Sequence, residues 1–102
     1  MSAKIDPVLH APARLQIAAV LARVSEAEFA RLREVTEVSD SVLSKHLSAL
    51  AEAGYVRLRK AAQGGRQRTW AALTSAGRAA FRSHLAALAG LIEAAAQSAA
   101  AE

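Results

Sequence analysis

The chain lacks cysteine altogether, which excludes disulfides, thiolate metal sites and thiol catalysis. Aromatic residues are scarce, so the core must be built mainly from leucine and valine. No charge-free run of about 18 apolar residues occurs, so no transmembrane helix is expected. The first residues also lack the apolar core of a signal peptide. These absences predict one soluble, cytoplasmic domain over residues 1–102.

Acidic residues are absent from the stretch 57–68, although an earlier segment of the chain is rich in them. That stretch holds five cations, namely Arg57, Arg59, Lys60, Arg66 and Arg68. Residues 25–37, by contrast, carry four acids and two arginines. The whole chain has a formal net charge of +4. A positive excess placed in one segment indicates a polyanionic partner.

Three helices are predicted in the first half of the chain. Apolar spacing predicts the first from Ala11 or Pro12 to near Arg23, after a loose lead-in over residues 1–8. Its stripe comprises Leu9, Ala13, Ile17, Val20, Leu21 and Val24. Ser25 and Glu28 match a capping box, which predicts a second helix from there to about Val35 or Thr36. After a short turn, Ser39 is a good N-cap for a third helix that ends at Gly54.

A hairpin and a long helix are predicted in the second half. Val56 and Leu58 alternate with arginines, which is typical of a strand with one buried face. Residues 61–66 form a loop with a Gly-Gly turn, and residues 67–73 return with Trp70 and Leu73 as packing residues. A last helix then runs from Thr74 or Ser75 to about Ala99. Apolar residues recur along this helix at alternating spacings of four and three positions. They form one apolar seam, which comprises Phe81, Leu85, Leu88, Ile92, Ala95 and Ala99.

The apolar seam of the last helix is longer than the surface that the rest of the domain can pack against it. The stretch beyond Leu88 has nothing left in its own chain to pack against. We therefore expect the helix over residues 74–100 to contribute to a homodimer through the seam residues Phe81, Leu85, Leu88, Ile92 and Ala95.

Two short helices followed by a basic hairpin suit the reading of double-stranded DNA. A helix fits the major groove, and small polar side chains let its axis approach the groove floor. The predicted contacts of the third helix are Ser39, Asp40, Ser41, Val42, Ser44, Lys45 and Ser48. The hairpin can lie along the backbone or enter a minor groove. Its predicted contacts are Arg59, Lys60, Arg66, Gln67 and Arg68.

Residues 39–56, from Ser39 to Val56, resemble the recognition helix and first wing strand of ArsR-like and MarR-like winged helix-turn-helix regulators. The matching positions are Ser39, Leu43, Ser44, Lys45, His46, Leu47, Leu50, Gly54 and Val56. Leu73-Thr74-Ser75-Ala76-Gly77-Arg78 is similar to the motif that opens the final helix in MarR-like proteins. The resemblance covers roughly residues 11–90 and is closest to compact winged-helix regulators between the two groups.

This resemblance implies a bacterial, dimeric transcriptional regulator, more often a repressor than an activator. The implied fold is mostly α with a small β-hairpin wing (α+β), in the order α-α-α-β-β-α. The ArsR-like metal sensors carry a cysteine-containing box, which this chain lacks. No cofactor is therefore expected, and a small-molecule effector, if one exists, stays undefined.

Other classes of function have less support in the sequence. His10, His46 and His84 lie too far apart for metal-ligand spacing, and the Gly-Gly pair lacks a phosphate-loop pattern. No paired carboxylates or triad candidates point to an enzyme. A protein-interaction module on the same fold is the alternative, because fold does not fix function. Salt-sensitive affinity for DNA separates the two.

Overall fold

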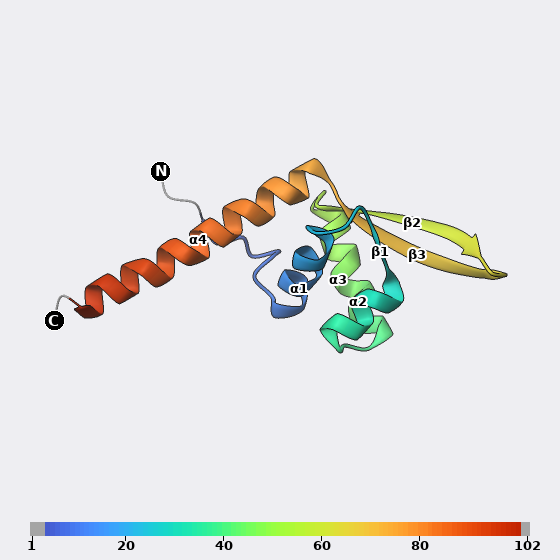
Figure 1. Ribbon diagram of the computed structural model, residues 1–102, viewed down its shortest axis with the longest axis horizontal. Coiled ribbons are helices and arrows are strands. Elements are labelled where there is room, and N and C mark those ends of the chain that lie inside the picture. Colours follow the sequence, from blue (N-terminus) through green and yellow to red (C-terminus); the bar gives the residue numbers. More distant parts are fainter. Residues whose placement is uncertain (1–3, 101–102) are drawn as a thin grey trace.

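The computed structural model describes residues 4–100 and contains four helices and three strands within that range (Figure 1). They are α1 (Pro12–Leu21), β1 (Ala27–Glu28), α2 (Phe29–Thr36), α3 (Asp40–Glu52), β2 (Val56–Gln63), β3 (Arg66–Leu73) and α4 (Ser75–Ala100). The predicted order and the mostly α architecture with a β-hairpin are confirmed. In Figure 1 the hairpin and α4 extend in opposite directions from a body made by α1, α2 and α3.

The core lies between the three short helices and the inner end of the hairpin. Its fully buried large residues are mainly leucines, as the scarcity of aromatics required: Leu9, Ile17, Leu21, Leu32, Leu43 and Leu50. Val56 and Leu73 close this core from the sheet. Val24 does not join it, contrary to the predicted stripe, because α1 ends at Leu21 and Val24 lies exposed in the following turn.

The predicted capping box at Ser25 and Glu28 is wrong. Ala27 and Glu28 instead form a two-residue strand that pairs with Ala71 and Trp70 of β3. Helix α2 begins only at Phe29, and its N-cap residue Glu28 makes no side-chain cap. The pairing gives the edge of β3 a hydrogen-bonding partner and makes the sheet three-stranded, in the order β1-β3-β2.

The hairpin is longer and its loop shorter than predicted. The two strands pair from Val56↔Leu73 out to Gln63↔Arg66, which leaves only Gly64 and Gly65 in the turn. Both glycines have positive φ, the conformation that two-residue hairpin turns of this hand require. Leu58 was predicted to be buried but is exposed, because the hairpin leaves the body before that position.

The described part of the segment before α1 packs against the body, although the sequence predicted a loose lead-in. The Asp6 amide donates to His84 Nδ1 at 2.9 Å, and Leu9 is fully buried. The Asp6 carboxylate accepts from the Tyr55 hydroxyl at 2.7 Å, and this hydrogen bond raises the pKa of Tyr55. Residues 1–3 of the predicted lead-in lie outside the described residues.

Helix α4 rests on the body through one face of its first half only. Gly77, His84 and Ala87 are buried on that face, whereas every residue from 89 to 100 is exposed. Leu85, a residue of the predicted seam, is also exposed. Its side chain projects about 100° around the helix from that of the buried His84. The molecule is therefore elongated, with extents of 63 × 26 × 21 Å.

The start of α4 is fixed by an unusually close approach between chain segments. The Thr74 hydroxyl accepts from the Gly77 amide at 3.0 Å and so acts as the N-cap that the sequence predicted for Thr74 or Ser75. The same hydroxyl donates to the Gly54 carbonyl at 2.6 Å. A Cβ on Gly77 would lie 2.0 Å from the Tyr55 carbonyl oxygen. Only glycine fits there without moving the backbone.

The substitution Gly77→Ala is expected to destabilise the fold by about 1–3 kcal/mol, because the methyl group must displace the Tyr55 backbone. Gly90→Ala is the matched control, since its Cβ meets nothing within 4 Å. That control should stabilise α4 by about 0.5–1 kcal/mol. Thermal unfolding resolves the pair, because about 1 kcal/mol shifts Tm by about 4–8 °C in a domain near this size. Equal Tm values for the two variants would contradict the close approach.

Candidate nucleic-acid interface

Helix α3 has one buried face and one exposed polar face. Leu43, Leu47 and Leu50 are buried against the body. All seven positions predicted for the recognition helix are exposed, from Ser39 to Ser48. Among them Ser41, Ser44, Lys45 and Ser48 follow the i, i+3, i+4, i+7 pattern of a single helix face. This face is polar and carries short side chains apart from Lys45.

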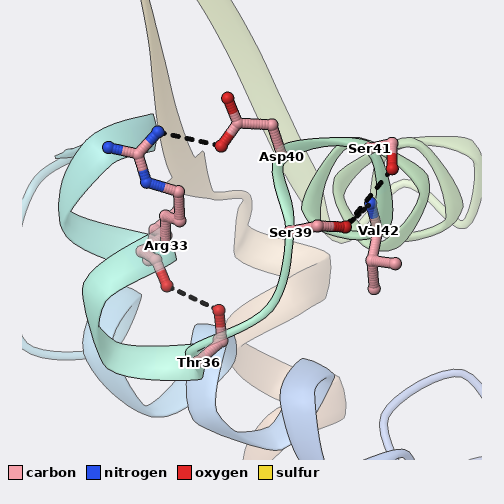
Figure 2. Close-up of polar contacts among 7 residues, drawn as sticks. Arg33, Thr36, Ser39, Asp40, Ser41 and Val42 are labelled. Carbon is pink, nitrogen blue, oxygen red and sulfur yellow. Dashed lines mark hydrogen bonds and ion pairs between the residues drawn. The ribbon is translucent and has the colours of Figure 1, made fainter.

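The N-terminus of α3 is organised by local hydrogen bonds (Figure 2). The Ser39 hydroxyl accepts from the Val42 amide at 3.3 Å, which confirms it as the N-cap, and lies 3.3 Å from the Ser41 hydroxyl. Asp40 accepts from Arg33 of α2 at 2.8 Å, and this bond raises the pKa of Arg33. Asp40 was predicted to face DNA, and its charge is balanced by Arg33, a residue that sequence reasoning missed.

The turn between α2 and α3 depends on one residue in an uncommon conformation. Glu37 is the only described non-glycine residue with positive φ, at 57°. It forms the C-cap of α2, where a left-handed residue ends the helix and redirects the chain. Thr36 supports the turn by donating its hydroxyl proton to the Leu32 carbonyl at 2.8 Å. Nothing in the sequence marks a glutamate for this role.

The exposed face of α3 and the hairpin border the same hollowed surface. A groove of about 590 Å³ is lined by Ser44 of α3, by Arg33 of α2 and by Arg66, Gln67 and Arg68 of β3. A smaller hollow of about 240 Å³ lies beside it. That hollow brings together Ser44, Ser48, Lys60 and Thr69. Thr69 was not predicted as a site residue, and its place follows from the strand register, which sets it opposite Lys60.

The cations of the wing (β2, β3 and the turn between them) fall into two groups. Arg57, Lys60 and Arg66 are exposed and form no ion pair with residues 4–100. Arg59, by contrast, pairs with Glu26, and Arg68 pairs with Glu28. The hydrogen bond to Glu26 raises the pKa of Arg59, whose guanidinium also lies 5.6 Å from the centroid of the Trp70 ring. Trp70 is half-buried under this contact.

Neither the histidines nor the acids of residues 4–100 form a metal centre. Within residues 4–100, no group of three or more potential ligands is close enough together to hold a metal ion. His84 is fully buried, with Nδ1 accepting from the Asp6 amide, and its ring meets that of His10 edge to face at 5.5 Å. No helix in the same range is long and apolar enough to cross a membrane.

His46 lies at the edge of the buried face of α3 and is half-buried. Its Nδ1 accepts a hydrogen bond from Arg14 Nε of α1 at 3.1 Å, which ties α3 to α1. Burial and the neighbouring Arg14 charge both lower the pKa of His46. The contact therefore requires a neutral imidazole.

A tri-helical body with an exposed polar third helix, a basic two-stranded wing and a long following helix defines the winged helix-turn-helix class of DNA-binding proteins. The chain belongs to the family of winged helix DNA-binding domains, whose pattern it matches over residues 13–92. It is 32% identical over 78 residues to an uncharacterised protein of Methanocaldococcus jannaschii, covering 76% of this chain and 85% of that one.

Solved structures similar to this chain include transcriptional regulators of the MarR-like and ArsR-like winged-helix type. A transcriptional regulator homologue from Pyrococcus horikoshii superposes with a TM-score of 0.77 at 26% identity, covering 85% of this chain and 86% of that one. The transcriptional repressor BigR from Xylella fastidiosa superposes with a TM-score of 0.60 at 26% identity, covering 71% and 68%. The predicted resemblance to these two groups is confirmed.

An NMR pH titration should find the pKa of His46 below its ordinary value of 6.5. The unfolded chain then binds a proton more readily than the folded one, so the contribution of His46 to stability is present above about pH 6.5 and is lost as pH falls through the folded pKa. Arg14→Gln should raise the pKa of His46 only part of the way back to 6.5, because the burial that also lowers this pKa remains. Arg23→Gln removes an exposed charge elsewhere and should leave it unmoved. A His46 pKa at or above 6.5 would contradict the Arg14 contact.

Proposed function

We propose that this protein is a sequence-specific regulator of transcription that binds double-stranded DNA as a homodimer and acts as a repressor. The observation that carries the proposal is the shared surface of α3 and the wing. There Ser44 and Ser48 of α3 lie beside Lys60 and Arg66, two wing cations that pair with no acid of residues 4–100. Family membership supports DNA as the partner, and the repressor role is supported by the likeness to BigR. Since the partner is DNA, we place the protein in the cytoplasm.

In this proposal α3 enters the major groove and reads bases. The exposed side chains of α3 face the base edges in this arrangement. Hydrogen-bond donors and acceptors come from Ser41, Ser44, Lys45 and Ser48, and the apolar group comes from Val42. Ser39 and Asp40 stay at the helix start, where the N-terminal amides of α3 favour a phosphate. The pairing of Asp40 with Arg33 keeps an unbalanced negative charge away from that phosphate.

The wing contributes contacts that do not depend on sequence. Lys60, Arg66 and Gln67 are exposed on the hairpin, and the first two carry charges that no acid of residues 4–100 neutralises. We propose that these three meet the phosphate backbone or the edge of a minor groove. Arg59 and Arg68 belong to the same hairpin but are held in ion pairs.

Binding should be steeply salt dependent and should prefer the DNA upstream of the protein's own coding sequence. With about 6–10 phosphate contacts, affinity should fall about 10³–10⁵-fold between about 50 and 200 mM salt. Lys60→Ala/Arg66→Ala should weaken all duplexes alike and make the logarithmic salt slope shallower by about 0.9 for each phosphate that is no longer neutralised. Ser44→Ala or Lys45→Ala should instead change sequence preference. Fluorescence anisotropy on upstream and random duplexes measures both quantities.

Arg82→Ala is the matched control for these variants, because it removes an exposed cation of α4 outside the interface. It should leave the affinity and the slope close to those of the wild type. If the unmodified protein binds neither duplex at the lower salt concentration, the regulator proposal fails. The search then turns to a protein partner of α3 and the wing.

We propose that the second half of α4 pairs with the α4 of a second copy. Leu91 and Ile92 are 62% and 67% exposed, although both are large and apolar. Leu91 continues the line of His84 and Ala87 beyond the end of the body, and Ile92 continues the predicted seam through Phe81, Leu85 and Leu88. The alanines that follow, including Ala95, permit a close approach of two helices. Such a dimer should hold its two recognition helices about 34 Å apart, one turn of DNA.

Leu91→Glu/Ile92→Glu should convert the dimer to a monomer in sedimentation velocity, since it places two like charges in an apolar contact. Ala86→Glu adds a charge to an exposed position on the opposite side of α4 and should leave the dimer intact. A charge variant that stays dimeric would show that another surface joins the two copies.

A further inference from the structure

Two wing arginines are engaged by acids of their own chain. Glu28 lies in β1, and Glu26 precedes that strand by one position. Because β1 pairs with β3, both carboxylates are brought beside the base of the wing. Arg59 donates to both carboxylate oxygens of Glu26, and Arg68 donates to one oxygen of Glu28. Two acids of the segment 25–37 are thus each paired with one arginine of the segment 57–68.

Both pairs lie where DNA can reach them. The side chains of Arg59 and Glu26 are 51% and 34% exposed, and those of Arg68 and Glu28 are 38% and 25% exposed. Arg68 and Glu28 also line the larger groove, next to Ser44 of the recognition helix. A phosphate arriving in that groove therefore meets an arginine that already has an anionic partner.

We propose that Glu26 and Glu28 withhold Arg59 and Arg68 from the DNA backbone and so restrict the sequence-independent part of DNA affinity. The inference rests on the proposed DNA-binding function and adds a specificity-determining role for residues outside the recognition helix. A carboxylate offers arginine the same bidentate geometry as a phosphate. It is also covalently tethered next to its partner, whereas the DNA must be captured from solution. Replacing the glutamate carboxylate with a DNA phosphate as the partner of the arginine therefore gains little binding free energy.

The consequence is a larger ratio of specific to random binding. Phosphate contacts supply essentially all of the affinity for random DNA, which competes with an operator at a great excess of sites. Two arginines fewer on the backbone lower that competing affinity, while the polar face of α3 keeps its contacts with bases. Arg57, Lys60 and Arg66 remain as wing cations without an acidic partner among residues 4–100.

Glu26→Gln/Glu28→Gln tests the idea, because glutamine keeps an acceptor oxygen for each arginine and removes only the charge. The double variant should bind a short random-sequence duplex more tightly than the wild type. Its logarithmic salt slope should be steeper by about 0.9 for every arginine that engages a phosphate. The ratio of upstream to random affinity should fall. Glu52→Gln/Glu93→Gln makes the same change in net charge with exposed acids on α3 and α4, and should reproduce none of the change in slope.

Arg59→Ala/Arg68→Ala gives a second, independent measurement. In the presence of Glu26 and Glu28 these arginines stay in their ion pairs, so their removal should leave the salt slope on random DNA unchanged. Combined with the two glutamine substitutions, it should abolish the increase in affinity. A wild-type slope that becomes shallower without the arginines, or a glutamine variant that binds random DNA no more tightly, overturns the inference. Failure of the wild type to bind any duplex overturns the proposed function instead.

Discussion

The carbonyl oxygen of Tyr55 is the point on which the arrangement of the whole molecule depends. It accepts the Thr74 amide at 3.0 Å and lies so close to Gly77 that no side chain fits between them. The end of α3, the first residue of the wing and the first turn of α4 therefore meet at one place. The Tyr55 hydroxyl also donates to Asp6, so the segment before α1 is joined to the same place. Through this junction, the direction in which α4 leaves the body is fixed relative to the recognition helix and the wing.

Local patterns in the sequence predicted the elements that rest on local interactions. Ser39 caps α3, and Gly54 follows its end with φ of 80°, because both roles involve only neighbouring residues. The capping box failed for the opposite reason. Ser25 and Glu28 have the right spacing, but the backbone at Ala27 and Glu28 pairs with β3 and the Glu28 carboxylate pairs with Arg68, 40 positions away. Tertiary partners of this kind leave no mark on periodicity or spacing.

The same limit applies to the candidate interface. Sequence reasoning placed the polar face of α3 correctly on the surface, since Leu43, Leu47 and Leu50 define the opposite face. It treated the acidic segment 25–37 and the basic hairpin as separate features, whereas the fold sets Glu26 and Glu28 against Arg59 and Arg68. Strand order and register decide that Arg59 and Arg68 are paired with acids while Arg57, Lys60 and Arg66 are not. The register also places Thr69 beside Lys60 on this surface, and the packing of α2 against α3 places Arg33 there.

The two-residue length of β1 has a mechanical consequence for the wing. The sheet is three strands wide only as far as Trp70, and from there to Gly64 and Gly65 the hairpin is a two-stranded ribbon without support on either edge. Such a ribbon twists more readily than a wider sheet. The base of the wing is thus held by β1 and by the carboxylates of Glu26 and Glu28, whereas the tip has no such support and can bend. In the proposed complex with DNA, a bendable tip would let Arg66 follow grooves of different width, while the supported base would keep the wing in a constant position relative to α3.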